Sequence, residues 1–225
     1  MDLDTLHAIA RDALEKRSSH AWKEPGNKFY HGERTAKLAL HLREILFPGE
    51  TQGNDILTVA AWFHDLRNGE ENHCELGAEE TARLIAPYCT PAECGEICRI
   101  IRRHDDRTSP RTDFSDLEKL HQDADLLDHF GTYDIWMSFL YSAHHGETPL
   151  SAAEFMRREK LQDYDHWLNR LNYELSRCIY REKLAYQLAF LDRFDAELDG
   201  QIWTPDRVLE TCHGEGGQAA AADRT

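Results

Sequence analysis

The sequence predicts an all-α protein, a single compact bundle of many helices. Apolar residues recur at intervals of three and four along most of the chain, as they do on the buried face of a helix. No segment shows the sustained alternation of apolar and polar residues that is typical of a half-buried strand. Two capping boxes, Thr90-Pro91-Ala92-Glu93 and Ser115-Asp116-Leu117-Glu118, indicate where two of the helices begin.

The same periodicity places the helices in order along the chain. Pro48-Gly49 ends the second helix, and Pro87 follows the end of the fourth. The third helix is apolar on nearly all sides, which predicts that it is buried. We expect helices over residues 3–16, 29–47, 55–65, 73–86, 90–103, 115–128, 132–141, 152–161, 167–177 and 181–198.

Residues 1–200 are expected to form one helical domain, in which the C-terminal helices pack on the same core. Residues 201–225 are expected to form a flexible tail, because the stretch from Thr211 onward is rich in Gly and Ala and has no pattern. Among apolar residues at helical spacing, Trp136, Tyr133 and Phe139 are expected in the core, although Tyr133 has the shape to stack on a base.

The charge of the chain limits its partners. The 225 residues carry 41 Asp and Glu against 26 Lys and Arg, a formal net charge of -15. Such a surface repels polyanions, and no basic patch is visible, so we expect no general nucleic-acid binding. A small phosphorylated substrate remains compatible if cations lie near its site. The oligomeric state stays open.

Cysteines and apolar runs indicate the compartment. None of the six cysteines forms a CxxC pair, no secretory signal precedes the first helix, and no apolar run is long enough to span a membrane. We therefore expect a cytoplasmic protein without membrane contact. Cys94 and Cys98 lie one helical turn apart, but small buried thiols beside Ile97 and Ile101 are the simpler interpretation.

Three segments place titratable side chains on faces that should be buried. His31 begins the core stripe of the second helix, which continues through Thr35, Leu38, Leu42 and Ile45. His64-Asp65 ends the buried third helix. A buried carboxylate is costly unless it is paired or binds a metal, so Asp65 needs either a cation such as Arg67 or a metal ion.

The third segment is Asp123-Ala124-Asp125-Leu126-Leu127-Asp128, which precedes His129. Asp125 and Asp128 share one helical face with Leu117, His121 and Ala124. A solvated acidic face is the simpler interpretation, but the apolar residues between the carboxylates argue against it.

Together these segments resemble the HD superfamily of metal-dependent phosphohydrolases, and especially its small stand-alone bacterial members. The family signature is a histidine, a His-Asp pair and a later aspartate, here His31, His64-Asp65 and Asp125. The resemblance extends beyond these four residues. Arg34 follows His31 by three residues, as in the family, and His73 begins a "His-x-x-x-Gly-Ala-Glu" motif. His104 matches the histidine that follows, and residues 123–128 match the family segment "Asp-Ala-Asp-x-Leu-Asp". It covers about residues 28–145 and, more loosely, the helices to about 198.

The resemblance implies a divalent metal ion (Mn, Fe, Co, Ni, Zn or Mg) bound by His31, His64, Asp65 and Asp125. Such an ion activates water for attack on a phosphate ester or anhydride of a small substrate, most naturally a nucleotide. Asp65, His104, Arg34 and His73 are the expected catalytic residues. The guanidinium group of Arg34 can donate two hydrogen bonds to a phosphate, although a solvent-exposed salt bridge is the simpler interpretation of this residue.

The number of metal ions stays open at this point. In some relatives, histidines at the positions of His73 and His104 hold a second metal, and in others they act as acid or base, so the count is one or two per chain. Asn68 stands where cyclic-dinucleotide phosphodiesterases have Lys and five-prime nucleotidases have Glu, which argues against both branches.

Two other functions use the same scaffold. A di-iron oxygenase acting on a small organic substrate would use the four ligands together with His73 and His104. A non-catalytic ligand sensor would keep the metal site. His144 and His145 stand before Gly146 in an expected loop and are interpreted as ordinary surface histidines.

Overall fold

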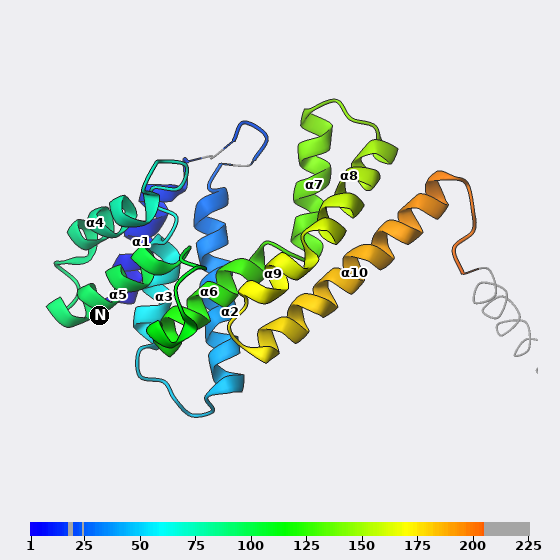
Figure 1. Ribbon diagram of the computed structural model, residues 1–225. Coiled ribbons are helices and arrows are strands. Elements are labelled where there is room, and N and C mark those ends of the chain that lie inside the picture. Colours follow the sequence, from blue (N-terminus) through cyan, green and yellow to red (C-terminus); the bar gives the residue numbers. More distant parts are fainter. Residues whose placement is uncertain (18–19, 24, 205–225) are drawn as a thin grey trace, which may run out of the picture.

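The computed structural model describes residues 1–17, 20–23 and 25–204. Helices make up most of these residues and no strand occurs among them, which confirms the predicted all-α class (Figure 1). The helices of the described chain are α1 (Leu3–Leu14), α2 (Asn27–Leu46), α3 (Asn54–Phe63), α4 (His73–Ile85), α5 (Pro91–Arg103), the 3-10 helix η1 (Arg111–Asp113), α6 (Asp116–Asp128), α7 (Thr132–His144), α8 (Pro149–Gln162), α9 (Tyr164–Arg170) and α10 (Glu174–Leu198).

The long helix α2 runs through the middle of the bundle and packs on α3 and α6 (Figure 1). The described helices form three apolar clusters. One joins α1, α3, α4 and α5 through residues such as Leu6, Phe63 and Ile101. The second joins α2, α3, α6 and α10, and the third joins α7, α8 and α10 around Ile135 and Leu191. The first two clusters hold the helices from which the candidate site residues come.

Helices α2 and α3 cross in close contact at Gly32. A Cβ atom at this position would lie 2.7 Å from the carbonyl oxygen of Ala61 and 3.2 Å from Cα of Trp62. These are backbone atoms that cannot rotate away, so the crossing requires glycine. Because Gly32 follows His31, the contact also brings His31 against the end of α3.

Both expected capping boxes are confirmed. The side chain of Thr90 accepts a hydrogen bond from the amide of Glu93, and that of Ser115 accepts one from the amide of Glu118. In each case the glutamate accepts from the amide of the capping residue in return. These contacts begin α5 and α6 at defined residues, and α6 carries the aspartates of the site.

The helix expected over residues 167–177 is wrong. The chain leaves α9 after Arg170, and α10 begins at Glu174, seven residues before the expected start at 181. The carboxylate of Asp123 accepts hydrogen bonds from the backbone amides of Asn172 (2.7 Å) and Tyr173 (3.0 Å). A buried side chain from α6 thus satisfies the amides that precede α10, and no local pattern shows this.

Two apolar residues expected in the core are exposed. Trp136 is 58% exposed, because α7 packs through Ile135 and Phe139 instead. Ile45 is 62% exposed, since the packed side of α2 shifts to Leu46 at its end.

Other expectations agree better with the structure. His144 and His145 are exposed, and the first of them closes α7, which extends three residues past its expected end. Of the two thiols expected to be buried beside Ile97 and Ile101, Cys98 is buried and Cys94 is only partly buried. Of the expected tail, residues 205–225 lie outside the described residues.

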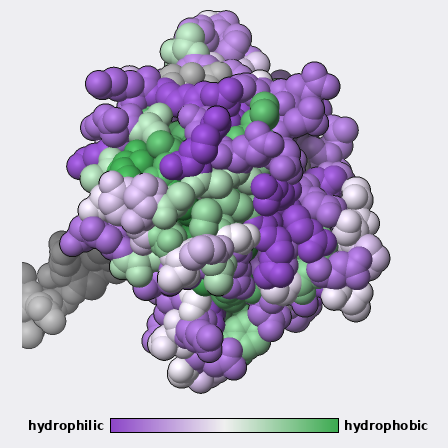
Figure 2. All heavy atoms as spheres, turned by 90° about the vertical axis from the view of Figure 1, so that its left-hand side faces the viewer, coloured by the Kyte–Doolittle hydropathy of each residue, from purple (hydrophilic) through white to green (hydrophobic). Residues whose placement is uncertain are grey.

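The face formed on the side of α4 and α5 is mostly hydrophilic, with a smaller hydrophobic patch near its centre (Figure 2). The hydrophilic surface agrees with the high content of charged residues, 30% of the chain. Within the described ranges, no helix combines the length and the apolar character that crossing a bilayer requires.

Candidate metal centre

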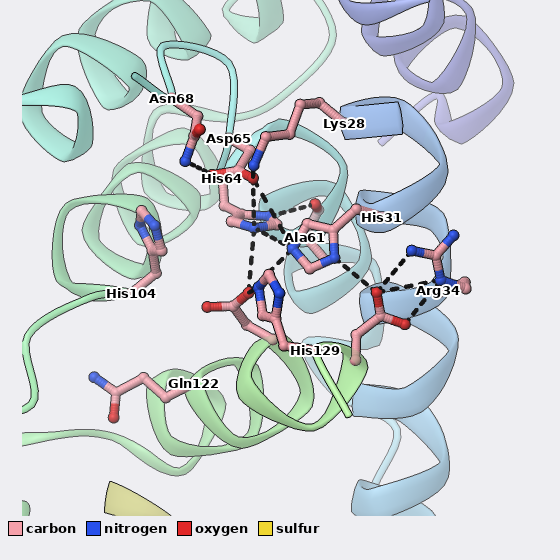
Figure 3. A network of polar contacts seen from close by, with 12 residues as sticks. Lys28, His31, Arg34, Ala61, His64, Asp65, Asn68, His104, Gln122 and His129 are labelled. Atoms are coloured by element: carbon pink, nitrogen blue, oxygen red, sulfur yellow. Dashed lines mark hydrogen bonds and ion pairs between the residues drawn. The ribbon is translucent and has the colours of Figure 1, made fainter. Parts of the chain in front are cut away.

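Four side chains that the sequence singles out meet at one point. His31 comes from α2, and His64 and Asp65 directly follow α3 (Figure 3). Asp125 lies in the last turns of α6. The Nε2 atoms of the two histidines are 3.2 Å apart. The Oδ1 atom of Asp125 lies 3.1 Å from Nε2 of His31 and 3.6 Å from Nε2 of His64.

The Oδ2 atom of Asp65 completes the group, 4.0 Å from Nε2 of His31 and 3.8 Å from Nε2 of His64. Ligand atoms that lie about 2.1 Å from one ion are about 3.0 Å apart at right angles and about 3.4 Å apart at the tetrahedral angle. Three of the five measured separations fall close to these values, and those to Asp65 are slightly longer. Two imidazoles and two carboxylates thus lie together as a set that could hold a metal ion, with His31 common to the groups that contain Asp65 and Asp125.

A second hydrogen bond fixes each histidine of this group. Nδ1 of His31 donates to Oδ2 of Asp128 at 2.8 Å, and Nδ1 of His64 donates to the carbonyl oxygen of Ala61 at 2.8 Å. In both rings Nε2 is the nitrogen that faces the centre. Bonds of this kind orient the imidazole and set its tautomer in protein metal sites.

Three cations support the three carboxylates. Lys28 pairs with Oδ2 of Asp65. The fork of Arg34 donates to Asp128, with Nε 2.8 Å from Oδ1 and Nη2 2.8 Å from Oδ2. Nη2 of Arg107 lies 3.6 Å from Oδ2 of Asp125. Since these charges balance one another, a divalent ion bound here would bring a net positive charge, which suits a phosphate group.

The pKa values record the same electrostatics. Burial of His31 disfavours its protonation, but its hydrogen bonds to Asp125 and Asp128 outweigh burial and raise its pKa to about 9. Burial of Asp65 acts to raise its pKa, yet the neighbouring His64 and Lys28 hold it below the usual range. The centre therefore attracts a positive charge strongly, either a proton or a metal ion.

The backbone adds to this attraction. Three helices end at the centre: His64 is the C-cap of α3, His104 of α5 and His129 of α6. The C-terminal end of a helix carries a partial negative charge, which favours cations nearby. Side chains and helix ends thus act in the same direction.

The two outer histidines of the prediction lie beside the first group. The ring centroid of His104 is 5.1 Å from that of His64 and 5.4 Å from that of His73. Nδ1 of His104 donates to the carbonyl oxygen of Ile101 at 2.7 Å. Cys74 joins this pair, with Sγ 3.4 Å from Nε2 of His73. The structure thus brings every predicted site residue into one region.

Several residues of this region carry no signal in the sequence that assigns them to the site. Asp65 pairs with Lys28 of α2, while Arg67, its nearest cation in sequence, pairs with Glu70 and Glu80. Arg34 forms an ion pair with Asp128. Its binding of a substrate phosphate stays a prediction. His121 and His129 are the exception, because they lie in and directly after α6, the helix that carries Asp125.

These two histidines differ in environment. Nε2 of the exposed His129 lies 3.7 Å from Oδ1 of Asp125. His121 is completely buried, its ring centroid is 5.0 Å from that of His64, and within the described part of the chain neither ring nitrogen has a hydrogen-bond partner. Burial lowers the pKa of His121 well below its ordinary value, so the ring is neutral.

Two cavities open on the centre and meet at His129. One, of about 180 Å³, is lined by His31 and Arg34 together with Lys28, Trp22 and Tyr133. The other, of about 410 Å³, is lined by Asp125 and includes Arg107, Arg170 and Trp167. Both therefore combine cations with aromatic rings next to the candidate ligands.

No protein-family model matches the sequence, and no curated protein is similar to it. Solved structures, however, share its fold. An HD-superfamily hydrolase from Bacillus thuringiensis has a TM-score of 0.64 and 22% identity over 88% of this chain and 97% of that chain. A predicted HD-superfamily hydrolase from an uncultured Thermotogales bacterium has a TM-score of 0.59 and 22% identity, over 87% and 92%. YpgQ of Bacillus subtilis, in complex with ADP, has a TM-score of 0.61 and 19% identity, over 87% and 94%.

These similarities cover most of each chain, so they concern the whole arrangement of helices and not one motif. The protein has the fold of HD-superfamily hydrolases, as the sequence motifs predicted.

Proposed function

We propose that the protein is a metal-dependent phosphohydrolase that cleaves a phosphate ester or anhydride of a small substrate, most naturally a nucleotide. One observation carries the proposal: the donor atoms of His31, His64, Asp65 and Asp125 converge, and a hydrogen bond outside the group fixes each histidine. Two nitrogen and two oxygen donors suit Mn, Fe, Co, Ni or Zn, and less well Mg.

When bound, the metal ion lowers the pKa of a coordinated water and polarises a phosphoryl oxygen. The chain supplies the remaining parts. Lys28 and Arg107 neutralise the ligand carboxylates and face the two cavities, where they favour an anionic group. His129 lies between the cavities, where an imidazole is placed to hand a proton to a leaving oxygen.

The choice of a nucleotide has two supports. Trp167 in the larger cavity offers an aromatic ring for a base beside Arg107 and Arg170, which attract phosphate. The structurally similar YpgQ has been crystallised with ADP. The net charge of -15 argues for a small substrate over a nucleic-acid chain.

The test is to measure the bound metal of the purified protein and to follow phosphate and pyrophosphate release from a panel of nucleotides with Mn²⁺, Co²⁺, Fe²⁺, Zn²⁺ and Mg²⁺. Asp65→Asn is expected to abolish release. The matched control is Asp55→Asn, the same change at an exposed site in the first turn of α3. It should keep both the metal and the activity.

Other outcomes identify the alternatives. Oxygen uptake without release, together with two irons per chain, would replace the proposal with an oxygenase on the same scaffold. Nucleotide binding without turnover for any metal would favour a sensor. Release that survives in Asp65→Asn would show that the ligand assignment is wrong.

A further inference from the structure

One side of α10 carries apolar side chains that no other described helix covers. The buried residues of α10, such as Leu184 and Leu191, face the bundle. A second row follows the spacing of a helical stripe along another side of α10 and consists of Tyr186, Ala189, Phe190, Arg193, Phe194 and Glu197. In Figure 1, α7, α8 and α9 all lie on the same side of α10, and its C-terminal half runs along the edge of the molecule.

This second row lines a hollow of about 420 Å³ together with Trp203, which follows the end of α10. All the lining residues belong to α10 or to the segment after it. Tyr186 is 52% exposed, and Leu198 and Ile202 at the end of the same stretch are 45% and 71% exposed. Exposed apolar side chains gathered in this way are typical of a surface that binds another protein chain.

The wall of the hollow is fixed from behind. Phe139 of α7 packs against both phenylalanines of the row, with its ring centroid 6.1 Å from that of Phe190 and 5.0 Å from that of Phe194. Two ion pairs from Arg157 of α8 also hold α10. Because these side chains are already ordered in the single chain, little conformational entropy is lost when a partner binds them.

The charges on the same face are self-complementary. Arg193 and Glu197 lie one helical turn apart, and Nε of the first is 2.8 Å from Oε1 of the second. The residues that line the hollow therefore carry no net charge, although the whole chain carries -15. When two copies of α10 cross antiparallel about a twofold axis midway between these residues, each Arg193 lies opposite Glu197 of the partner subunit. An apolar stripe with one residue of each charge thus fits a second copy of itself.

We propose that the α10 face, formed by Tyr186, Phe190, Arg193, Phe194, Glu197 and Trp203, is the interface of a homodimer with twofold symmetry. A standard interface buries about 800 Å² per partner, and one helical stripe offers less. We therefore expect a reversible dimer that dissociates in the micromolar range. The dimer does not depend on the metal centre or on the proposed hydrolysis.

The test is sedimentation equilibrium of the full-length protein from about 1 µM to about 200 µM. We expect the average mass to rise from that of one chain toward that of two. Tyr186→Ser should raise the dissociation constant about tenfold or more, because it removes an aromatic ring from the interface. Circular dichroism of this variant should not change, since the ring is half exposed in the single chain.

Reversal of the charges tests the geometry. Arg193→Glu places like charges opposite each other across the twofold axis, and so does Glu197→Arg, so each variant should have a dissociation constant about tenfold higher or more. Mixed in equal amounts, the two variants should form a heterodimer, in which both facing pairs have opposite charges. Arg11→Glu is the matched control: it breaks an exposed ion pair of the same i,i+4 spacing, with Glu15, and should leave the dimer unchanged.

Three results would overturn the proposal. The full-length chain could stay monomeric over the whole range, the two charge variants could fail to associate when mixed, or the dimer could persist unchanged in all of the α10 variants. A monomeric chain that loses stability in Tyr186→Ser would show that residues of the same chain cover this face instead.

Discussion

The two candidate metal sites are neighbours, yet they are built differently. The inner site (His31, His64, Asp65 and Asp125) is almost fully enclosed, and hydrogen bonds or ion pairs hold all four of its side chains. The outer site (His73, Cys74 and His104) includes two half-buried residues, and only His104 has a fixed outer partner. Packing and hydrogen bonds therefore make the inner site rigid, whereas the outer site depends on how the first turn of α4 meets the end of α5.

The largest expected effect comes from breaking the helix contact under the inner site. Gly32→Ala places a methyl group 2.7 Å from a backbone oxygen of α3, so α2 and α3 must separate. We expect a loss of about 1–3 kcal/mol in the free energy of unfolding, together with weaker metal binding at the inner site. Thermal denaturation and metal titration measure the two effects.

Gly77→Ala is the matched control on α4, next to the outer site. The added Cβ would lie 3.7 Å from the nearest atom, the carbonyl oxygen of His64, which is an ordinary contact. We expect unchanged or slightly higher stability, because glycine within a helix costs about 0.5–1 kcal/mol relative to alanine. Equal losses in the two variants would mean that the tight crossing at Gly32 is not what sets the inner site.

The second prediction concerns the outer partner of His31. Asp128→Asn keeps the shape but weakens the acceptor for Nδ1 and the ion pair with Arg34. Such changes lower metal affinity about 10–100-fold. We expect this loss when metal is titrated into the purified variant, with the fold unchanged by circular dichroism. Metal affinity equal to that of the unaltered protein would show that Asp128 does not position His31 for a metal ion.

The third prediction concerns pH in the metal-free protein. The pKa of His31 is raised from 6.5 to about 9, so its protonated form stabilises the fold. This stabilisation is complete below pH 6.5 and is lost as the pH rises through 9. The Tm of the metal-free protein should therefore fall across this range, by about 2–4 °C for each kcal/mol lost.

Metal binding changes this pH dependence, since coordination requires the neutral imidazole and releases its proton below pH 9. The metal-loaded protein should not show the fall in Tm that comes from His31, and metal affinity should rise with pH up to about 9. His31→Gln should also flatten the profile of the metal-free protein. A Tm of the unaltered metal-free protein that rises between pH 6.5 and 9 would contradict the assignment.

The smallest effect is expected at the outer site. His73 is half-buried and contacts Cys74 and the ring of His104. His73→Ala should change the stability of the metal-free protein by less than about 0.5 kcal/mol, as is usual for substitutions near the surface. A loss of several kcal/mol in denaturant unfolding would show that this residue is part of the packed core.

The sequence by itself determined the all-α class and the starts of α5 and α6, and it pointed to His31, His64, Asp65 and Asp125 as candidate metal ligands. Helical spacing shows which side of a helix faces the core, and a buried histidine or carboxylate on that side is costly unless it has a partner. Recurrence of such residues on three helices, together with the family motifs, was therefore enough to predict a metal site.

Only the tertiary structure decided which partners those side chains have. Asp65 pairs with Lys28 from α2 and not with the nearby Arg67. Asp123 accepts from the amides that precede α10, while Asp125, two residues on, joins the candidate metal centre. Cys74 meets His104 because α4 packs on α5. Spacing fixes the direction of a side chain relative to its own helix, but a contact between helices depends on where and how closely they cross.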